Sequence, residues 1–130
     1  MVRARIAIQL GVLAALASTL SGCSDPRQNI DLVALLSVDE SSGFYPYVAG
    51  GSDVTQVYCT DHVECLQSIE TPYFRMTRFA DSSDSLEFAQ GSRSDVHVSD
   101  WIVIEFTDRA TPHDREAIAS GIDGLYRSDP

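Results

Sequence analysis

The chain has 130 residues, of which 44% are hydrophobic and 22% are charged, so it is long enough for one small domain and too short for two. Nineteen acidic residues against nine basic ones give a net charge of −10. Because nucleic-acid binding rests on cationic contacts to phosphate, this charge argues against a nucleic-acid partner, and it argues equally against adhesion to anionic lipid head groups.

The first 22 residues have the pattern of an export signal. Arg3 and Arg5 form a short basic region, residues 6–17 are mostly apolar, and small residues follow. The apolar run is too short to cross a bilayer, which takes about 20 apolar residues. The alternative, a buried N-terminal helix, is disfavoured because no acidic residue precedes Asp25 and the run has no polar face. We therefore predict a signal peptide over residues 1–22.

The segment Leu20-Ser21-Gly22-Cys23 resembles the lipobox of bacterial lipoproteins at all four positions. In that family the cysteine thiol is joined to a diacylglyceryl group and the peptide is cut just before the cysteine. The resemblance implies that Cys23 is the lipidation site, carrying fatty acids such as palmitate, and that the chain is anchored in the cell membrane on its extracytoplasmic side. Two acyl chains anchor a protein stably, whereas one holds it only marginally. Residues 23–29 would then be a lipidated tether, and residues 30–130 a small domain.

The region before the cysteine pair predicts little regular structure. Apolar residues over 30–38 favour a helix, with a strand as the close alternative. Residues 39–53 are expected to form a loop, because glycine and proline recur there. Ser52 or Asp53 is expected to begin a short helical turn that leads to Cys59.

Cys59 and Cys65 flank His62 in the stretch "CTDHVEC". Outside the cytoplasm, with Cys23 joined to lipid, the remaining two cysteines are predicted to form a disulfide. One alternative is a metal site made of Cys59, His62 and Cys65, but structural zinc usually takes four ligands from paired cysteine motifs, and no second pair is present. The other alternative is a catalytic thiol with a base, for which a lone cysteine would be expected.

Asp61 and Glu64 fit an N-cap and its capping-box partner, which predicts a helix from Asp61 to about Glu70. Both cysteines within one regular helix would lie about 9 Å apart. Disulfides require Cα atoms within about 7 Å. A helix that begins between them, with Cys59 just outside it, removes this conflict.

The second half of the chain shows stronger periodicity. Residues 73–79 and 100–108 predict strands, the latter with Ile102, Ile104 and Phe106 on one face. Helices are predicted from Asp81 or Ser82 to Gly91, and from a Thr111 cap to about Gly124. The connection from 80 to 100 is long enough for a right-handed crossover, which predicts a parallel pair. The fold class is thus α+β: a two- or three-stranded sheet with three or four helices, arranged helix–strand–helix–strand–helix in this half.

Three stretches of this domain, "DHVECLQSIET", "DWIVIEFTD" and "DREAIASGIDGLYRSD", make it similar to small lipoproteins of high-G+C Gram-positive bacteria. The resemblance implies no particular activity.

A partner surface is predicted if the two strands are neighbours. One face would then carry Thr77 and Val103 together with four aromatic or charged side chains. These four are the candidate partner residues: Tyr73, Arg75, Trp101 and Glu105. Arg75 and Glu105 are expected to pair across it. Aromatic side chains around a charge pair suit a protein partner, and the alternative is that a helix or the N-terminal segment covers this face.

No catalytic motif is present: the chain lacks G-x-S-x-G, S-x-x-K, H-E-x-x-H and the spacing of a calcium loop. We therefore predict a non-catalytic binding or accessory module of the cell envelope, without cofactor or metal, held by membrane lipid and open to a protein partner. The alternative is a structural or envelope-stress lipoprotein with no fixed ligand. The sequence leaves the oligomeric state open.

Overall fold

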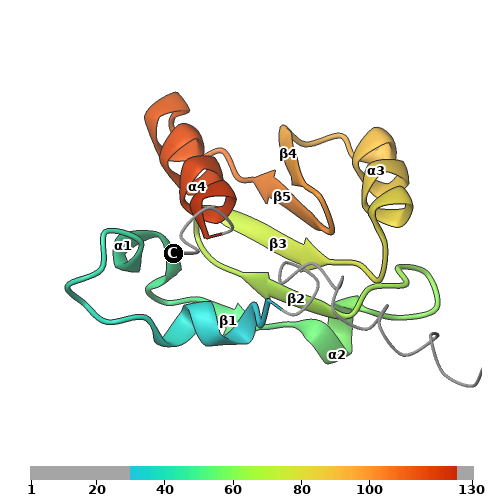
Figure 1. The fold of residues 1–130 in the computed structure, drawn as a ribbon, viewed down its shortest axis with the longest axis horizontal. Helices are drawn as coiled ribbons and strands as arrows, with labels where there is room; N and C mark the ends of the chain where they lie inside the picture. Colours follow the sequence, from blue (N-terminus) through green and yellow to red (C-terminus); the bar gives the residue numbers. More distant parts are fainter. Residues whose placement is uncertain (1–29, 126–130) are drawn as a thin grey trace, which may run out of the picture.

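The computed structural model describes residues 30–125, so the predicted signal peptide and the whole predicted tether, Cys23 included, lie outside the described residues. Within them the chain forms one five-stranded antiparallel sheet with strand order β1-β2-β3-β5-β4 (Figure 1). The strands are β1 (Ser52–Asp53), β2 (Gln67–Glu70), β3 (Phe74–Arg78), β4 (Val96–Ser99) and β5 (Ile102–Phe106).

The helices are the 3-10 helix η3 (Val33–Ser37) and the α-helices α1 (Tyr45–Val48), α2 (Thr55–Tyr58), α3 (Ser82–Gly91) and α4 (Pro112–Gly124). The α+β class is confirmed. The sheet is larger than the two or three strands expected, because the short strands β1, β2 and β4 join the two predicted ones.

The predicted parallel crossover is wrong. β3 and β5 are neighbours, but they run antiparallel, with Arg75 opposite Glu105. The connection between them contains β4, which forms a hairpin with β5 and so reverses the chain before it returns to β3. Asp100 takes a left-handed conformation in this hairpin turn, with φ 48°. Asp is among the few residues other than glycine that tolerate this region.

The predicted helix from Asp61 to Glu70 is also wrong. Residues 67–70 form β2, and an isolated bridge joins Thr60 to Val63. Ser68 and Ile69 are both fully buried, one on each face of the sheet, as expected for an inner strand. The burial of these two side chains between neighbouring strands outweighs the local capping pattern.

The helices predicted from Asp81 or Ser82 to Gly91 and from Thr111 to about Gly124 are confirmed, and α2 is the helical turn expected before Cys59. Residues 30–38 hold the short 3-10 helix η3, and residues 39–53, expected to form a loop, contain α1 and β1. The Asp81 side chain accepts a hydrogen bond from the backbone N–H of Asp84, 2.9 Å away, at the start of α3. Thr111 and Asp114 form a reciprocal capping box at the start of α4, with Pro112 at its first position. Each bond satisfies an N–H that lacks a partner in the first helical turn. Asp53 acts similarly before α2, where its carboxylate accepts from the N–H of Thr55 at 3.0 Å.

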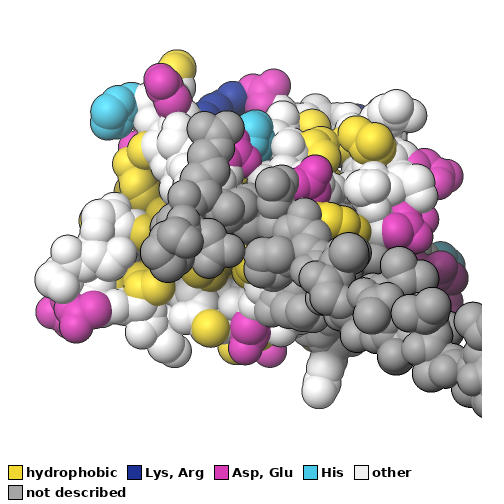
Figure 2. All heavy atoms as spheres, viewed as in Figure 1, with side chains coloured by type: hydrophobic (Ala, Val, Ile, Leu, Met, Phe, Trp, Pro, Cys, Tyr) yellow, Lys and Arg dark blue, Asp and Glu magenta, His cyan; other side chains and the backbone are white. Residues whose placement is uncertain are grey.

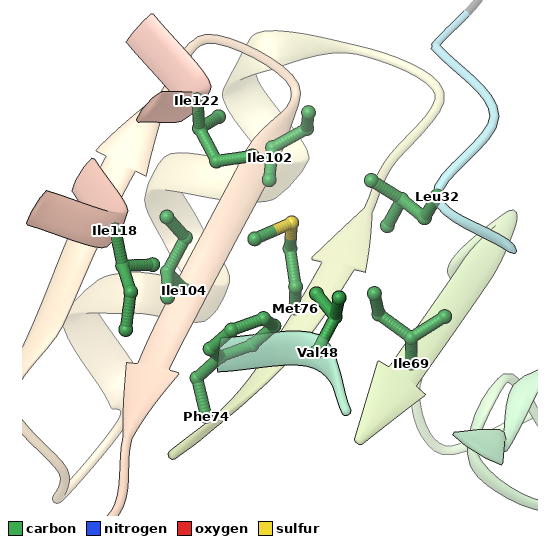
Figure 3. Packing of buried hydrophobic residues seen from close by; sticks show 9 residues of the cluster. All are labelled: Leu32, Val48, Ile69, Phe74, Met76, Ile102, Ile104, Ile118 and Ile122. Carbon is green, nitrogen blue, oxygen red and sulfur yellow. The ribbon is translucent and has the colours of Figure 1, made fainter. Parts of the chain in front are cut away.

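One face of the sheet, which we call the apolar face, carries the main core (Figure 3). Helix α4, helix α1 and the residues at the start of η3 cover it. The buried cluster consists of Ile69, Phe74, Met76, Ile102 and Ile104 from the strands, and Leu32, Val48, Ile118 and Ile122 from the covering segments. Full burial of such a side chain contributes about 1.5–3 kcal/mol.

The opposite face, which we call the polar face, carries Ser68, Arg75, Thr77, Val103 and Glu105. Helices α2 and α3 lie over it: Thr55 of α2 hydrogen-bonds Ser68, and Phe88 of α3 packs on Phe79 with ring centroids 5.2 Å apart. The hydroxyls of Ser68 and Thr77 share a buried hydrogen bond of 3.0 Å. Both faces of the sheet are therefore covered.

Candidate functional site

The most unusual group of side chains lies on the polar face. We call Tyr58, Arg75, Ser92 and Glu105 the Glu105 cluster. The Nε of Arg75 donates to Glu105 Oε1 at 3.0 Å, and the hydroxyl of Tyr58 donates to the same oxygen at 3.5 Å. The hydroxyl of Ser92 donates to Oε2 at 3.2 Å. The guanidinium of Arg75 also lies over the ring of Tyr58, 3.9 Å from its centroid, which is a cation–π contact.

Each member of the cluster is placed by a different element. The register of β3 on β5 sets Arg75 directly opposite Glu105. Tyr58 ends α2, one residue before the disulfide at Cys59, and Ser92 is the C-cap of α3. Three other segments thus converge on the carboxylate of Glu105, a residue that is only 9% exposed.

The electrostatics of the cluster favour its ion pair. Burial raises the pKa of Tyr58, and the neighbouring charge of Glu105 raises it further. Burial alone would lower the pKa of Arg75, but the hydrogen bond and charge of Glu105 outweigh that effect and raise it. Arg75 therefore stays charged and Tyr58 stays neutral at physiological pH.

A depression of about 360 Å³ opens beside Glu105. Tyr58, Ser92 and Glu105 line it together with Phe88 of α3 and the loop that follows α3; the remaining lining residues are Glu87, Gly91, Arg93 and Ser94. Its walls combine two aromatic rings with hydroxyls and charges of both signs. A depression of this kind suits a polar ligand or a side chain of a partner better than a purely apolar one.

The geometry of the cluster is that of a held ion pair. The carboxylate of Glu105 accepts hydrogen bonds from one guanidinium and two hydroxyls, those of Tyr58 and Ser92.

The predicted partner residues occupy three places. Arg75 and Glu105 meet, as expected, with an Nε–Oε1 distance of 3.0 Å. Tyr73 precedes β3 and Trp101 precedes β5, and in an antiparallel pair these positions lie at opposite ends. Tyr73 packs edge-on against Tyr47, at 5.3 Å between ring centroids, beside the core of the apolar face. Trp101 is half-buried in the hairpin turn.

Sequence reasoning missed Tyr58 and Ser92. Tyr58 is next to a cysteine and Ser92 follows the helix-ending Gly91, but neither position carries a pattern that points to Glu105. Only the tertiary arrangement of α2 and α3 over the sheet brings them there.

Cys59 and Cys65 are joined by a disulfide with a Cα–Cα distance of 4.9 Å. Their sulfurs are bonded to each other and are not thiolate ligands, so they do not form the alternative metal site with His62. Within the described part of the chain, no three His, Cys, Asp or Glu side chains are grouped as metal ligands would be. His62 is exposed, at the edge of a hollow of about 310 Å³ between the disulfide loop and α3.

This second hollow is acidic. Asp61, Glu64, Asp84 and Glu87 line it, and Glu87 and Phe88 also line the depression at Glu105, so the two adjoin. The pKa of Asp84 is raised by burial and by the neighbouring charge of Asp81.

None of the helices within residues 30–125 combines the length and the hydrophobicity needed to cross a bilayer. Comparison with protein-family models, with curated proteins and with solved structures finds no match to the chain.

Proposed function

We propose that this chain is a lipoprotein anchored through Cys23 in the cell membrane, facing the extracytoplasmic side, where it acts as a non-catalytic binding or accessory module. The domain itself is small and acidic, and its disulfide closes a short loop. The lipid would hold it at the membrane surface, and the negative charge would keep the domain off anionic head groups.

The observation that carries this proposal is the use of the three cysteines. Cys59 and Cys65 are paired in a disulfide, a bond that persists in oxidising compartments outside the cytoplasm. The third cysteine, Cys23, follows Leu20-Ser21-Gly22 directly after the apolar leader. A location outside the cytoplasm explains why Cys59 and Cys65 are paired, and lipidation explains the role of Cys23.

The binding role is supported by the Glu105 cluster. A buried carboxylate is costly unless it is paired and hydrogen-bonded, and three other segments supply its partners here. Of the four predicted partner residues, only Arg75 and Glu105 lie side by side, and the depression opens beside Glu105. A partner at the envelope would contact this depression.

Metabolic labelling with a palmitate analogue tests the anchor. The unaltered chain should incorporate the label and sediment with membranes, whereas Cys23→Ser should incorporate none. Ser24→Ala is the matched control, because it leaves all four lipobox positions intact, and it should be labelled normally. Equal labelling of Cys23→Ser and the unaltered chain would refute lipidation at this residue.

Purification of the labelled chain from detergent-solubilised membranes tests the binding role. A partner that co-purifies in fixed proportion, and is lost with Arg75→Met, supports a binding module that uses the Glu105 cluster. Recovery of the chain alone would instead favour the structural or envelope-stress role with no fixed ligand.

A further inference from the structure

The two edge strands of the sheet differ in length and in the segments that lie beside them. β1 forms one edge with only two residues, and the chain around it is held by η3 and by α2. β4 forms the other edge with four residues, Val96–Ser99, and no further strand of residues 30–125 pairs with it (Figure 1). An unpaired edge presents a row of backbone donors and acceptors that can bind another extended chain.

The hydrogen-bond register identifies the groups that point outward. The N–H of Phe106 donates to the carbonyl of Asp95 at 3.0 Å. Because bonded pairs alternate in an antiparallel ladder, His97 and Ser99 direct their backbone groups toward β5 in the same way. Val96 and Val98 therefore direct theirs away from the sheet, giving two donors and two acceptors.

Contacts on both sides hold this edge in place. On the apolar face, His97 Nε2 lies 3.1 Å from a carboxylate oxygen of Asp123 in α4. Arg115 of α4 binds Asp95, just before the strand. Helix α3 contacts β4 from the polar face. The edge thus needs little ordering before it accepts a strand, which lowers the entropic cost of binding.

Features that usually blunt an edge are scarce here. Val96–Ser99 contains neither proline nor lysine, and its register with β5 is continuous, without a bulge. Its shortness and the acidic residues that flank it are its safeguards. Two outward residues bind a short extended segment through the backbone, with side-chain contacts supplying the selectivity.

Charge decides what kind of strand fits. The carboxylates of Asp95, Asp100 and Asp123 lie around the strand, where they outnumber the two guanidinium groups of Arg93 and Arg115. Asp and Glu side chains are also spread over the visible surface, where Arg is scarce (Figure 2). A second copy of this chain, with its own net charge of −10, is repelled, whereas a basic segment is attracted.

We propose that the outer edge of β4 binds an extended, basic segment of another envelope protein as an added strand. This inference rests on the proposed role as a binding module and names a partner surface for it. The Glu105 depression opens on the polar face beside the loop that leads into β4, so a bound segment would lie next to it.

The test uses the full chain in detergent and fluorescently labelled, end-blocked hexapeptides. One peptide alternates Val with Arg and the other alternates Val with Glu. The basic peptide should bind saturably and at least tenfold more tightly than the acidic one. Absence of saturable binding, or equal binding of the two peptides, would overturn the proposal.

Val98→Pro is the specific variant, because it removes an N–H that points away from β5 and leaves the ladder intact. It should weaken binding of the basic peptide at least tenfold, while Val98→Thr, which keeps the N–H, should bind normally. Equal binding by the two variants would contradict strand addition.

Methylating the backbone nitrogens of the basic peptide gives a second measurement that does not depend on how Val98→Pro folds. The methylated peptide should lose binding to the unaltered chain, and unchanged binding would contradict the proposal. Sedimentation velocity should show a monomer; a dimer that Val98→Pro dissociates would make a second copy the occupant. Palmitate labelling reports on the anchor separately, so a labelled chain that binds no peptide refutes the edge site alone.

Discussion

The two faces of the sheet bury side chains of different kinds, apolar on one face and polar on the other. On the apolar face, Ile69, Met76 and Ile104 are fully buried against α1, α4 and the start of η3, and they need no partner beyond close packing. On the polar face, Ser68 and Thr77 are just as buried, and Glu105 nearly so, but each depends on a specific hydrogen bond. Packing alone explains the first face. The second costs more to build and is where a function other than stability is to be sought.

The largest expected effect is on the apolar face. Ile104→Ala removes a fully buried side chain from the centre of the core and should lower the free energy of unfolding by about 2–5 kcal/mol. Urea titration followed by circular dichroism measures this loss. Val57→Ala is the control, because Val57 is 82% exposed, and it should change stability little. Similar losses for both variants would contradict the assigned core.

The next effect tests the polar face. Arg75→Met leaves the carboxylate of Glu105 without its ionic partner and should cost about 1–3 kcal/mol of stability. The double variant Arg75→Met with Glu105→Met removes both charges and should recover most of that loss, because a buried pair contributes little net stability. Additive losses in the double-mutant cycle would show that the two groups are not coupled.

A smaller effect compares the helices that cover the two faces. Thr111→Ala removes the N-cap of α4 on the apolar face, and Asp81→Ala removes that of α3 on the polar face. Each should lower the melting temperature through a loss of about 1 kcal/mol. Ser120→Ala, at an exposed position within α4, should have almost no effect. A neutral result for either cap variant would mean that the helix end is held by other contacts.

The smallest expected effect appears only in alkali. Burial and then Glu105 raise the pKa of Tyr58, while burial and then Asp114 raise the pKa of Tyr47 near the apolar face. The folded chain keeps these protons to a higher pH than the unfolded chain, in which tyrosine ionises near pH 10. Stability should therefore be fully present below about pH 10 and fall as the pH rises through the folded pKa values.

Tyr58→Phe and Tyr47→Phe should each reduce this loss of stability in alkali. Urea titrations at a series of pH values from about 8 to beyond the ionisation of tyrosine near pH 10 measure it. An unchanged alkaline slope in both variants would contradict the shielding inferred for these two hydroxyls.

The sequence predicted those parts of the fold that depend on neighbouring residues. The cap of α4 at Thr111, the cap of α3 at Asp81 and the alternation of Ile102 and Ile104 in β5 are all local patterns, and the structure confirms them. The disulfide followed from the compartment and the spacing of two cysteines.

The parts that were missed depend on contacts between distant residues. Val96–Ser99 is too short to stand out as a strand, yet its hairpin with β5 turns a predicted parallel pair into an antiparallel one. Residues 61–70 carry a helix-capping pattern, but residues 67–70 form β2, in which Ile69 is fully buried. The change of strand direction also separated Tyr73 from Trp101, while the Arg75–Glu105 pair formed all the same.

The central claim is that one thiol carries lipid outside the cytosol while the other two are joined. Intact-mass spectrometry of the chain isolated from its native membrane, followed by fragmentation, tests all three cysteines at once. We expect a chain that begins at Cys23, with a diacylglyceryl group on that residue and a mass two hydrogens lower for the Cys59–Cys65 bond. A chain that still carries residues 1–22, an unmodified Cys23, or free thiols at residues 59 and 65 would contradict the account.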